Sequence, residues 1–227
     1  MFNRLILVTL AIITIFSSCT IEDSADVNQA KIYADYDLRY DANTDKTRVV
    51  ATFKFGGATG TNLQLSDPAQ VVFNGEKLPF KPIYGGHTKE FAGQVMSGTF
   101  EYTNTEGDVV VNTTPSIESI AFPDQFDSIS KSSSIELNWV GSPLSENQRT
   151  AIFIGSWTWG QDALFLENGE GANFIVLDKG GLNNLPLGNS TVFMERTTAR
   201  DIEEGTDEGG RIRASYRAEN KSIIIVE

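Results

Sequence analysis

Two tryptophans and a carboxylate lie close together in the segment GSWTWGQD. Trp157 and Trp159 are two positions apart, so on a strand they would share a face, and Asp162 follows three positions later. Exposed indole rings suit the C–H faces of sugars, and a nearby carboxylate accepts hydrogen bonds from sugar hydroxyls. We therefore treat these three residues as a candidate ligand-binding site. The alternatives are a protein contact, or burial as the continuation of a core row that contains Phe153 and Gly155.

A second motif, in the segment RYDANTDKT, resembles the start of a calcium-binding loop. Asp41, Asn43 and Asp45 alternate as oxygen ligands do in an EF-hand. The EF-hand also needs glycine at its sixth position and glutamate at its twelfth, where this chain has Lys46 and Phe53. Because Asn and Asp also favour turns, a hairpin turn is the preferred interpretation. We predict no metal or other cofactor, with Ca²⁺ left open.

The segment from residue 201 to residue 210 is rich in carboxylates. They are Asp201, Glu203, Glu204, Asp207 and Glu208. Such a loop could gather divalent cations, but a mobile, solvated tip between two strands explains the composition without an ion. Arg211, Arg213 and Arg217 follow it, on the outward face of the next expected strand, and we expect them to pair with nearby acids.

The chain has a single histidine, His87, so a Ser-His-Asp triad could form only through this residue. Its neighbourhood, YGGHTKEF, does not resemble a nucleophile elbow. A pair of catalytic carboxylates cannot be selected by spacing among 30 acidic residues. We therefore predict no catalytic residues and a protein that is not an enzyme.

The only cysteine, Cys19, follows directly on an apolar leader. The leader begins with Met1-Phe2-Asn3-Arg4 and continues with apolar residues from Leu5 to Phe16. This run is too short for a transmembrane helix, which needs about 20 residues, and has the length of a secretory signal. With one cysteine, no disulfide can form within the molecule, so the core alone must hold the fold.

Small residues directly before a cysteine resemble the lipobox of bacterial lipoproteins. Ser17 and Ser18 match its small positions, whereas Phe16 stands where that family usually has leucine. The resemblance implies that residues 1–18 are a signal peptide and that Cys19 carries fatty acyl chains. Two or three chains hold a protein on a membrane, where one binds only marginally. In the alternative, ordinary signal cleavage discards the cysteine.

Residues 19–29 are polar and acidic, which predicts a flexible tether. Glu22 and Asp23 also resemble the export signal of surface lipoproteins of the Bacteroidota type, so we expect an outer-membrane protein, with surface exposure favoured over a periplasmic orientation. Ser24 and Ser128 lie in Asp-Ser-aliphatic patterns that resemble O-glycosylation sites of the same bacteria. The net charge of −12 excludes nucleic acid as an expected partner and leaves membrane attachment to the lipid.

Beyond residue 30, apolar and polar residues alternate with the period of a β-strand. In residues 32–40 the apolar face contains Ile32, Tyr36 and Leu38, and residues 49–55 follow the same pattern. Asn74-Gly75 predicts a tight hairpin, and residues 105–108 predict another. No stretch of 12 or more residues has a convincing helical period. The chain is therefore expected to be all-β.

The spacing of the strands favours two consecutive Ig-like antiparallel β-sandwiches, at residues 30–114 and 115–227. This organisation resembles that of Ig-like outer-membrane lipoproteins of Bacteroidota-type bacteria. Such folds serve many functions. We expect a lipid-anchored envelope protein that binds or scaffolds a protein or glycan partner. A carbohydrate-binding or carbohydrate-acting protein that uses Trp157, Trp159 and nearby acids is one alternative, and a purely structural envelope component is another.

Overall fold

The computed structural model describes residues 21–156 and 160–227, and these residues fold almost entirely into β-strands. The predicted all-β sandwich class is confirmed. The helical segments in this part of the chain are one turn of α-helix and three 3₁₀ turns: α1 (Lys179–Leu182), η1 (Ser24–Asp26), η2 (Gln29–Lys31) and η3 (Pro82–Tyr84). None of them is long and apolar enough to cross a bilayer.

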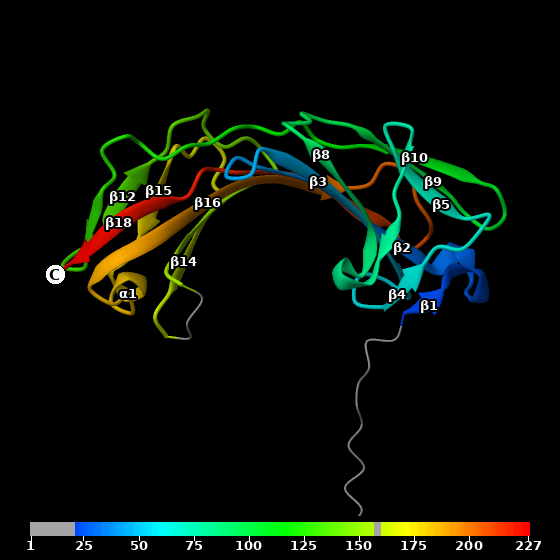
Figure 1. Cartoon of the computed structure of the whole chain (residues 1–227), viewed down its shortest axis with the longest axis horizontal. Helices are drawn as coiled ribbons and strands as arrows, with labels where there is room; N and C mark the ends of the chain where they lie inside the picture. Colours follow the sequence, from blue (N-terminus) through cyan, green and yellow to red (C-terminus); the bar gives the residue numbers. More distant parts are fainter. Residues whose placement is uncertain (1–20, 157–159) are drawn as a thin grey trace, which may run out of the picture.

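A 12-stranded sheet runs through the whole described molecule and bends into an arch (Figure 1). We call it the common sheet. Its strands are β1 (Glu22–Asp23), β2 (Ile32–Asp41), β3 (Lys46–Phe55), β4 (Thr61–Gln64), β7 (Phe80–Lys81), β8 (Gly86–Ala92), β11 (Ser128–Ser130), β13 (Gln148–Ile154), β14 (Ala163–Glu167), β16 (Gly188–Asp201), β17 (Gly210–Arg217) and β18 (Lys221–Val226).

Two smaller sheets cover the convex side of the arch (Figure 1). Over one half lie β5 (Gln70–Phe73), β6 (Glu76–Lys77), β9 (Thr99–Thr103) and β10 (Val109–Thr113), and over the other half lie β12 (Ile135–Asn138) and β15 (Phe174–Leu177). Each encloses a hydrophobic core against the common sheet. The first core includes Tyr36, Phe53 and Phe100, and the second includes Ile152 and Leu177.

The local sequence patterns produce the predicted strands and hairpins. Along β2 every second residue is buried, which follows the apolar alternation of the sequence. Asn74 and Gly75 have positive φ angles of 49° and 80°, and they join β5 to β6 as the predicted tight turn. The predicted hairpin around residues 105–108 connects β9 to β10. Short-range turn chemistry therefore fixed these pairings.

The two halves of the molecule share strands. Ile117 belongs to the first core and Ile120 to the second, so the chain passes from one core to the other close to the predicted boundary at residues 114 and 115. However, β17 returns from the later part of the chain, pairs in parallel with β2, and adds Ile212 and Ala214 to the first core. The segment 115–227 therefore contributes to both sandwiches, and the halves form one continuous sheet.

The predicted flexible tether over residues 19–29 is wrong for residues 22–29, which belong to the folded body. β1 pairs in parallel with β4, and Ser24 is fully buried. The amide N–H of Ser66 donates to Ser24 Oγ at 3.3 Å, and Gln29 Nε2 donates to the carbonyl oxygen of Ser24 at 2.7 Å. Polar side chains that satisfy neighbouring backbone groups order this segment although it has no apolar periodicity.

Candidate binding face

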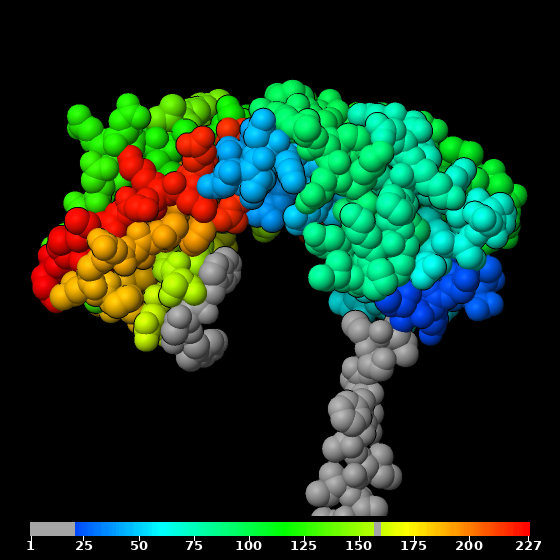
Figure 2. All heavy atoms as spheres, in the orientation of Figure 1, coloured from blue at the N-terminus to red at the C-terminus, as the bar shows by residue number. Residues whose placement is uncertain are grey.

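The concave side of the common sheet has no covering sheet, and Figure 2 shows the hollow beneath the arch. Alternate residues of each strand point toward the cores on the convex side, so the intervening residues point into this hollow. We call the surface that they form the concave face. It combines a charged strip on β2, β3 and β17 with an apolar strip on β13, β14 and β16.

Ion pairs between neighbouring strands run along the charged strip. Arg213 Nη2 lies 2.9 Å from Asp35 Oδ1, and Arg213 Nε lies 3.5 Å from Asp37 Oδ2. Arg217 Nε lies 3.9 Å from Asp41 Oδ2. The expectation of pairing with acids is confirmed for Arg213 and Arg217, whereas Arg211 forms no ion pair within the described residues. The acids come from β2 because the parallel pairing of β17 with β2 places them alongside.

Asp37 lies at the centre of this strip in an unusual electrostatic environment. Burial raises the pKa of the Asp37 carboxyl above its ordinary value, and the nearby Arg213 guanidinium opposes that shift only in part. Its Oδ1 is inaccessible to solvent and has no hydrogen-bond partner in the described chain. The strip therefore contains a buried acceptor whose hydrogen-bonding capacity is unused.

Two arginines face each other across the strip. Arg39 on β2 is directly opposite Arg48 on β3. Each is paired on its far side, Arg39 with Glu195 at 2.5 Å and Arg48 with Glu90 at 3.0 Å. The Arg48 guanidinium also lies over the ring of Tyr84, 5.0 Å from its centroid. These contacts hold the two positively charged guanidinium groups in place next to each other.

Two depressions of the surface meet at these arginines. One, of about 290 Å³, is lined by Asp35, Asp37, Arg39, Arg48, Val50, Thr52, Tyr84 and Arg213. The other, of about 160 Å³, is lined by Arg39, Asp41, Thr44, Lys46, Arg48 and Glu90. Arg39 and Arg48 belong to both, so a ligand that occupied either depression would contact them.

The apolar strip lies beside the charged one. Leu164 and Leu166 of β14 are each 61% exposed, and they stand next to Phe153 and Ala151 of β13. The ring of Phe153 lies 5.7 Å from that of Phe193, centroid to centroid. Exposed leucines beside aromatic rings form the kind of contiguous apolar surface that marks an interaction site.

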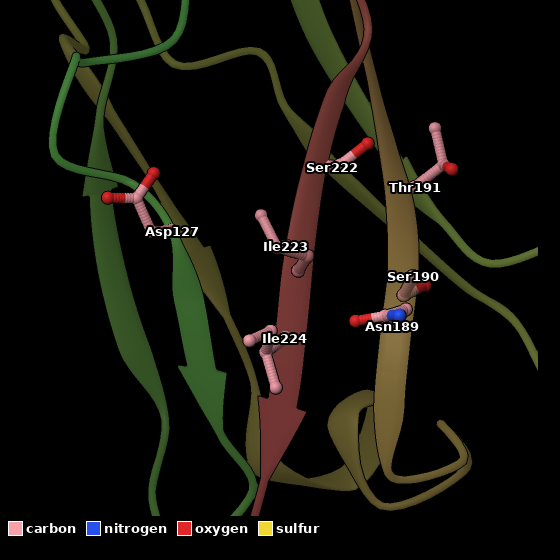
Figure 3. A pocket seen from close by; sticks show the side chains of 7 residues that line it. All are labelled: Asp127, Asn189, Ser190, Thr191, Ser222, Ile223 and Ile224. Carbon is pink, nitrogen blue, oxygen red and sulfur yellow. The ribbon is translucent and has the colours of Figure 1, made fainter.

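A further depression, of about 520 Å³, lies along β16 and β18 (Figure 3). It is lined by Asp127, Asn189, Ser190, Thr191, Ser222, Ile223 and Ile224. Asp127 is its only titratable lining residue, and Oδ1 of Asp127 lies 3.8 Å from Lys221 Nζ. This depression therefore contains no pair of carboxylates for acid–base chemistry.

The predicted Trp157 and Trp159 site falls on residues 157–159, outside the described residues. Asp162, its third member, is half-buried just before β14. The burial alternative depended on Phe153 lying in a core row. The structure instead places Phe153 on the concave face, while Ile152 and Ile154 enter the second core.

The weak metal candidates Asp41, Asn43 and Asp45 form the turn between β2 and β3. Asp41 Oδ1 accepts hydrogen bonds from the backbone N and the Nδ2 of Asn43, and Asp45 Oδ1 accepts one from the Tyr40 hydroxyl. Asn43 also joins the two halves, because its Nδ2 donates to the carbonyl oxygen of Ala218 at 3.0 Å. Local hydrogen bonds occupy these oxygens, as expected of a turn.

The acidic loop after β16 is attached to β10. Asn112, which is 2% exposed, accepts hydrogen bonds from the amides of Glu203 and Glu204 and donates to the carbonyl oxygen of Glu204. Glu204 Oε2 accepts from the amide of Val111 at 2.8 Å. The loop is therefore a clamp between the common sheet and its cover, and the expected mobile tip is wrong. No group of three or more metal-binding side chains occurs in residues 21–156 and 160–227.

His87 is buried, with both ring nitrogens engaged. Its Nε2 accepts from the amide of Leu65 at 3.2 Å, and its Nδ1 lies 3.1 Å from the carbonyl oxygen of Leu78, to which it can only donate. Burial lowers the pKa of His87 below its ordinary value, so the ring is neutral at pH 7. The ring is thus a structural link between strands, with neither nitrogen available to activate a nucleophile.

The predicted modification sites lie in different settings. Cys19 lies outside the described residues. Ser24 is fully buried and hydrogen-bonded, so its hydroxyl is inaccessible for glycosylation in the folded chain. Ser128, at the start of β11, is exposed.

No family model and no curated protein matches this chain. A solved structure of a 1.5-MDa bacterial ice-binding adhesin is 10% identical, with 86% of this chain and 65% of that chain covered and a TM-score of 0.25. The FN1–FN3 domains of chicken CNTN1 are 11% identical, with 83% and 66% covered and a TM-score of 0.22. The chain thus spans just under two thirds of each. At these TM-scores neither likeness bears on function.

Sequence analysis did not identify the concave face as a candidate site. The alternation did show that Asp35, Asp37 and Arg39 share one face of a strand, and that Arg213 and Arg217 share a face of another. It did not show that the two strands are neighbours, or that this shared face has no cover. The signal available in the sequence was the presence of charges of both signs on the polar face of one strand, which could have indicated a binding surface.

Proposed function

We propose that this protein is a lipid-anchored component of the bacterial cell envelope that binds a protein or glycan partner through its concave face and has no catalytic activity. The observation that carries the proposal is the contrast between the two faces of the common sheet. The convex face is covered by two sheets, whereas the concave face leaves ordered ion pairs and exposed leucines in the hollow of the arch.

The apolar strip supports a binding role on energetic grounds. Burying a leucine side chain contributes about 1.5–3 kcal/mol relative to leaving it in water. Leu164 and Leu166 forgo most of that contribution in the free protein, because each is 61% exposed. A partner that covered both side chains would recover it, and the adjacent charged strip would set the orientation of that partner.

The anchor proposed at Cys19 would hold the arch close to the membrane. The first strand begins at Glu22, so only Thr20 and Ile21 separate the cysteine from the folded body. An extended chain covers about 3.3–3.6 Å per residue, so this connection spans only about 10 Å. β1 lies at a foot of the arch (Figure 1), and the partner would therefore be reached near the bilayer surface.

The environment of His87 supports a non-catalytic role, since the single imidazole of the chain is engaged in two hydrogen bonds inside the fold. The arginine-paired acids of the concave face are likewise suited to electrostatic recognition. Turnover of any sugar or peptide substrate by the purified chain would overturn this part of the proposal.

Site-specific photo-crosslinking in the native host tests the binding face. A photoreactive residue at Leu166, on the concave face, should form adducts, and one at Val176 should not. Val176 is the matched control, because it is an exposed apolar residue, 43% accessible, on the covering strand β15. Equal labelling at the two positions, or none at Leu166, would refute the binding face.

Membrane attachment is tested separately by fractionation. The wild-type chain should remain with membranes until detergent is added and should incorporate labelled palmitate. Cys19→Ala should abolish both properties. A wild-type protein that washes into aqueous buffer would remove the anchor from the proposal.

A further inference from the structure

We propose that Arg39 and Arg48 form a binding site for the anionic groups of an acidic glycan, at the point where the two depressions of the charged strip meet. The site rests on the proposed binding role of the concave face and specifies the ligand class. It is distinct from the tryptophan-containing segment at residues 157–159.

The first observation is the juxtaposition of like charges. Arg39 and Arg48 are directly opposite each other on neighbouring strands, an arrangement that destabilises a sheet when nothing neutralises it. Glu195 and Glu90 pair with the two guanidinium groups only from the outer sides, and no acid of the described chain lies between these groups to offset their mutual repulsion. A ligand carboxylate or sulfate between the two groups would relieve the repulsion.

The second observation is the unused hydrogen-bonding capacity of the pair. A guanidinium group has five N–H donors. Arg48 directs Nε and Nη2 to a single oxygen of Glu90. Arg39 meets Glu195 through Nη2, which leaves its Nη1 outside that ion pair. The remaining donors can form the charge-assisted hydrogen bonds with which arginine recognises anionic groups.

The local balance of charge favours an anion although the chain as a whole is acidic. The net charge of the chain is −12, yet each depression is lined by three cationic side chains and two acidic ones. A long polyanion would be repelled by the rest of the protein. A short ligand with few charges would gain the local attraction with little of that repulsion.

The surroundings favour a glycan over a peptide. β2 and β3 are paired along both edges, so no free edge can take up a peptide as an extra strand. Val50 is the only aliphatic residue among those that line the two depressions, so apolar peptide anchors have no pocket there. Thr52 and Tyr84, which line one of the depressions, carry hydroxyl groups that can hydrogen-bond to sugar hydroxyls. Hydroxyls together with an anionic group are the chemistry of uronic acids and sulfated sugars.

Calorimetric titration of the purified full chain in detergent tests the site. The probes are a short oligogalacturonate with its neutral methyl ester, and a sulfated dextran oligomer with unmodified dextran. We expect at least one anionic probe to bind, more weakly as NaCl is raised, and its neutral counterpart to bind at least tenfold less tightly. Arg39→Gln and Arg48→Gln should each weaken binding about tenfold or more.

Arg149→Gln is the matched control, because Arg149 is an exposed arginine on the same side of the common sheet, on β13. Arg149→Gln removes one positive charge, as the two test substitutions do, and should leave the affinity for the anionic probe unchanged. The melting temperature of every variant is measured to confirm that it is folded. The proposal fails if neither anionic probe binds, if the neutral probes bind equally well, or if the Arg39→Gln/Arg48→Gln double variant binds normally. Crosslinking at Leu166 without glycan binding would leave the binding face standing and reject only this ligand class.

Discussion

Replacing Arg196 with methionine should destabilise the protein strongly. Arg196 is the largest fully buried side chain among the described residues and is 1% exposed. Its Nη1 donates to the carbonyl oxygen of Ser142 at 2.8 Å, and its Nη2 donates to that of Pro143 at 2.9 Å and to Gln148 Oε1 at 2.5 Å. Nη2 also lies 2.9 Å from Glu118 Oε2.

The magnitude follows from what the substitution leaves behind. Methionine fills much of the volume but donates no hydrogen bond, so all three hydrogen bonds from the guanidinium group are lost. The Pro143 carbonyl oxygen loses its donor, whereas the Ser142 carbonyl oxygen keeps Trp139 Nε1 and Gln148 Oε1 keeps the amide of Ser145. A hydrogen bond from a charged group contributes about 1.5–3 kcal/mol, and a buried acceptor left without a donor costs about 1–3 kcal/mol. Glu118 is 38% exposed and can be hydrated, so its own loss is smaller. From the three lost hydrogen bonds we expect Arg196→Met to lower the free energy of unfolding by about 3–5 kcal/mol, and Glu118→Gln to lower it by about 1 kcal/mol.

Urea denaturation followed by tryptophan fluorescence and far-UV circular dichroism measures both values. Arg149→Met provides the control, because Arg149 is solvent-exposed on the neighbouring strand β13 and its loss should change stability by less than about 0.5 kcal/mol. A loss below about 1 kcal/mol for Arg196→Met would refute the assignment of Arg196 as the polar hub between β16 and the segment 142–148.

Three further predictions concern buried polar groups. Tyr36→Phe should raise the free energy of unfolding by about 1 kcal/mol, since its buried hydroxyl has no hydrogen-bond partner in the described chain. Tyr40→Phe, which loses a hydrogen bond at 2.9 Å, should lower the free energy of unfolding, and equal effects in denaturation curves would contradict this. Asn112→Ala should lower the free energy of unfolding by about 2–3 kcal/mol and increase the rate of amide hydrogen exchange in the acidic loop. An unchanged exchange rate would show that Asn112 does not hold the loop in place. Burial lowers the pKa of His87, so the NMR signal of this imidazole should titrate with a midpoint below about pH 6.5. The unfolded chain then binds the proton more readily than the folded chain, so the contribution of His87 to stability should be complete above about pH 6.5 and should be lost as the pH falls through the folded-state pKa. A titration midpoint above about pH 6.5 would contradict this direction.

Several features were predictable because they depend on neighbours in the chain. The alternation along residues 32–40 reports which side of β2 is buried, and Asn74-Gly75 adopts the positive φ angles that a two-residue hairpin requires. The ordered structure of residues 22–29 could not be predicted from the local sequence. Its order comes from Ser66, more than 40 positions away, whose amide bonds to Ser24.

The sequence by itself determined the all-β class, the strands, the hairpins and the resemblance of the leader to a lipoprotein signal, since periodicity and turn chemistry are local properties. Only the tertiary structure decided that β17 lies in parallel beside β2. That pairing brings Arg213 to Asp35, 178 positions away, and leaves the charged side of both strands without a cover. A period of two marks which side of a strand is polar but contains no information about its neighbour, which is selected by the packing of all strands around two cores.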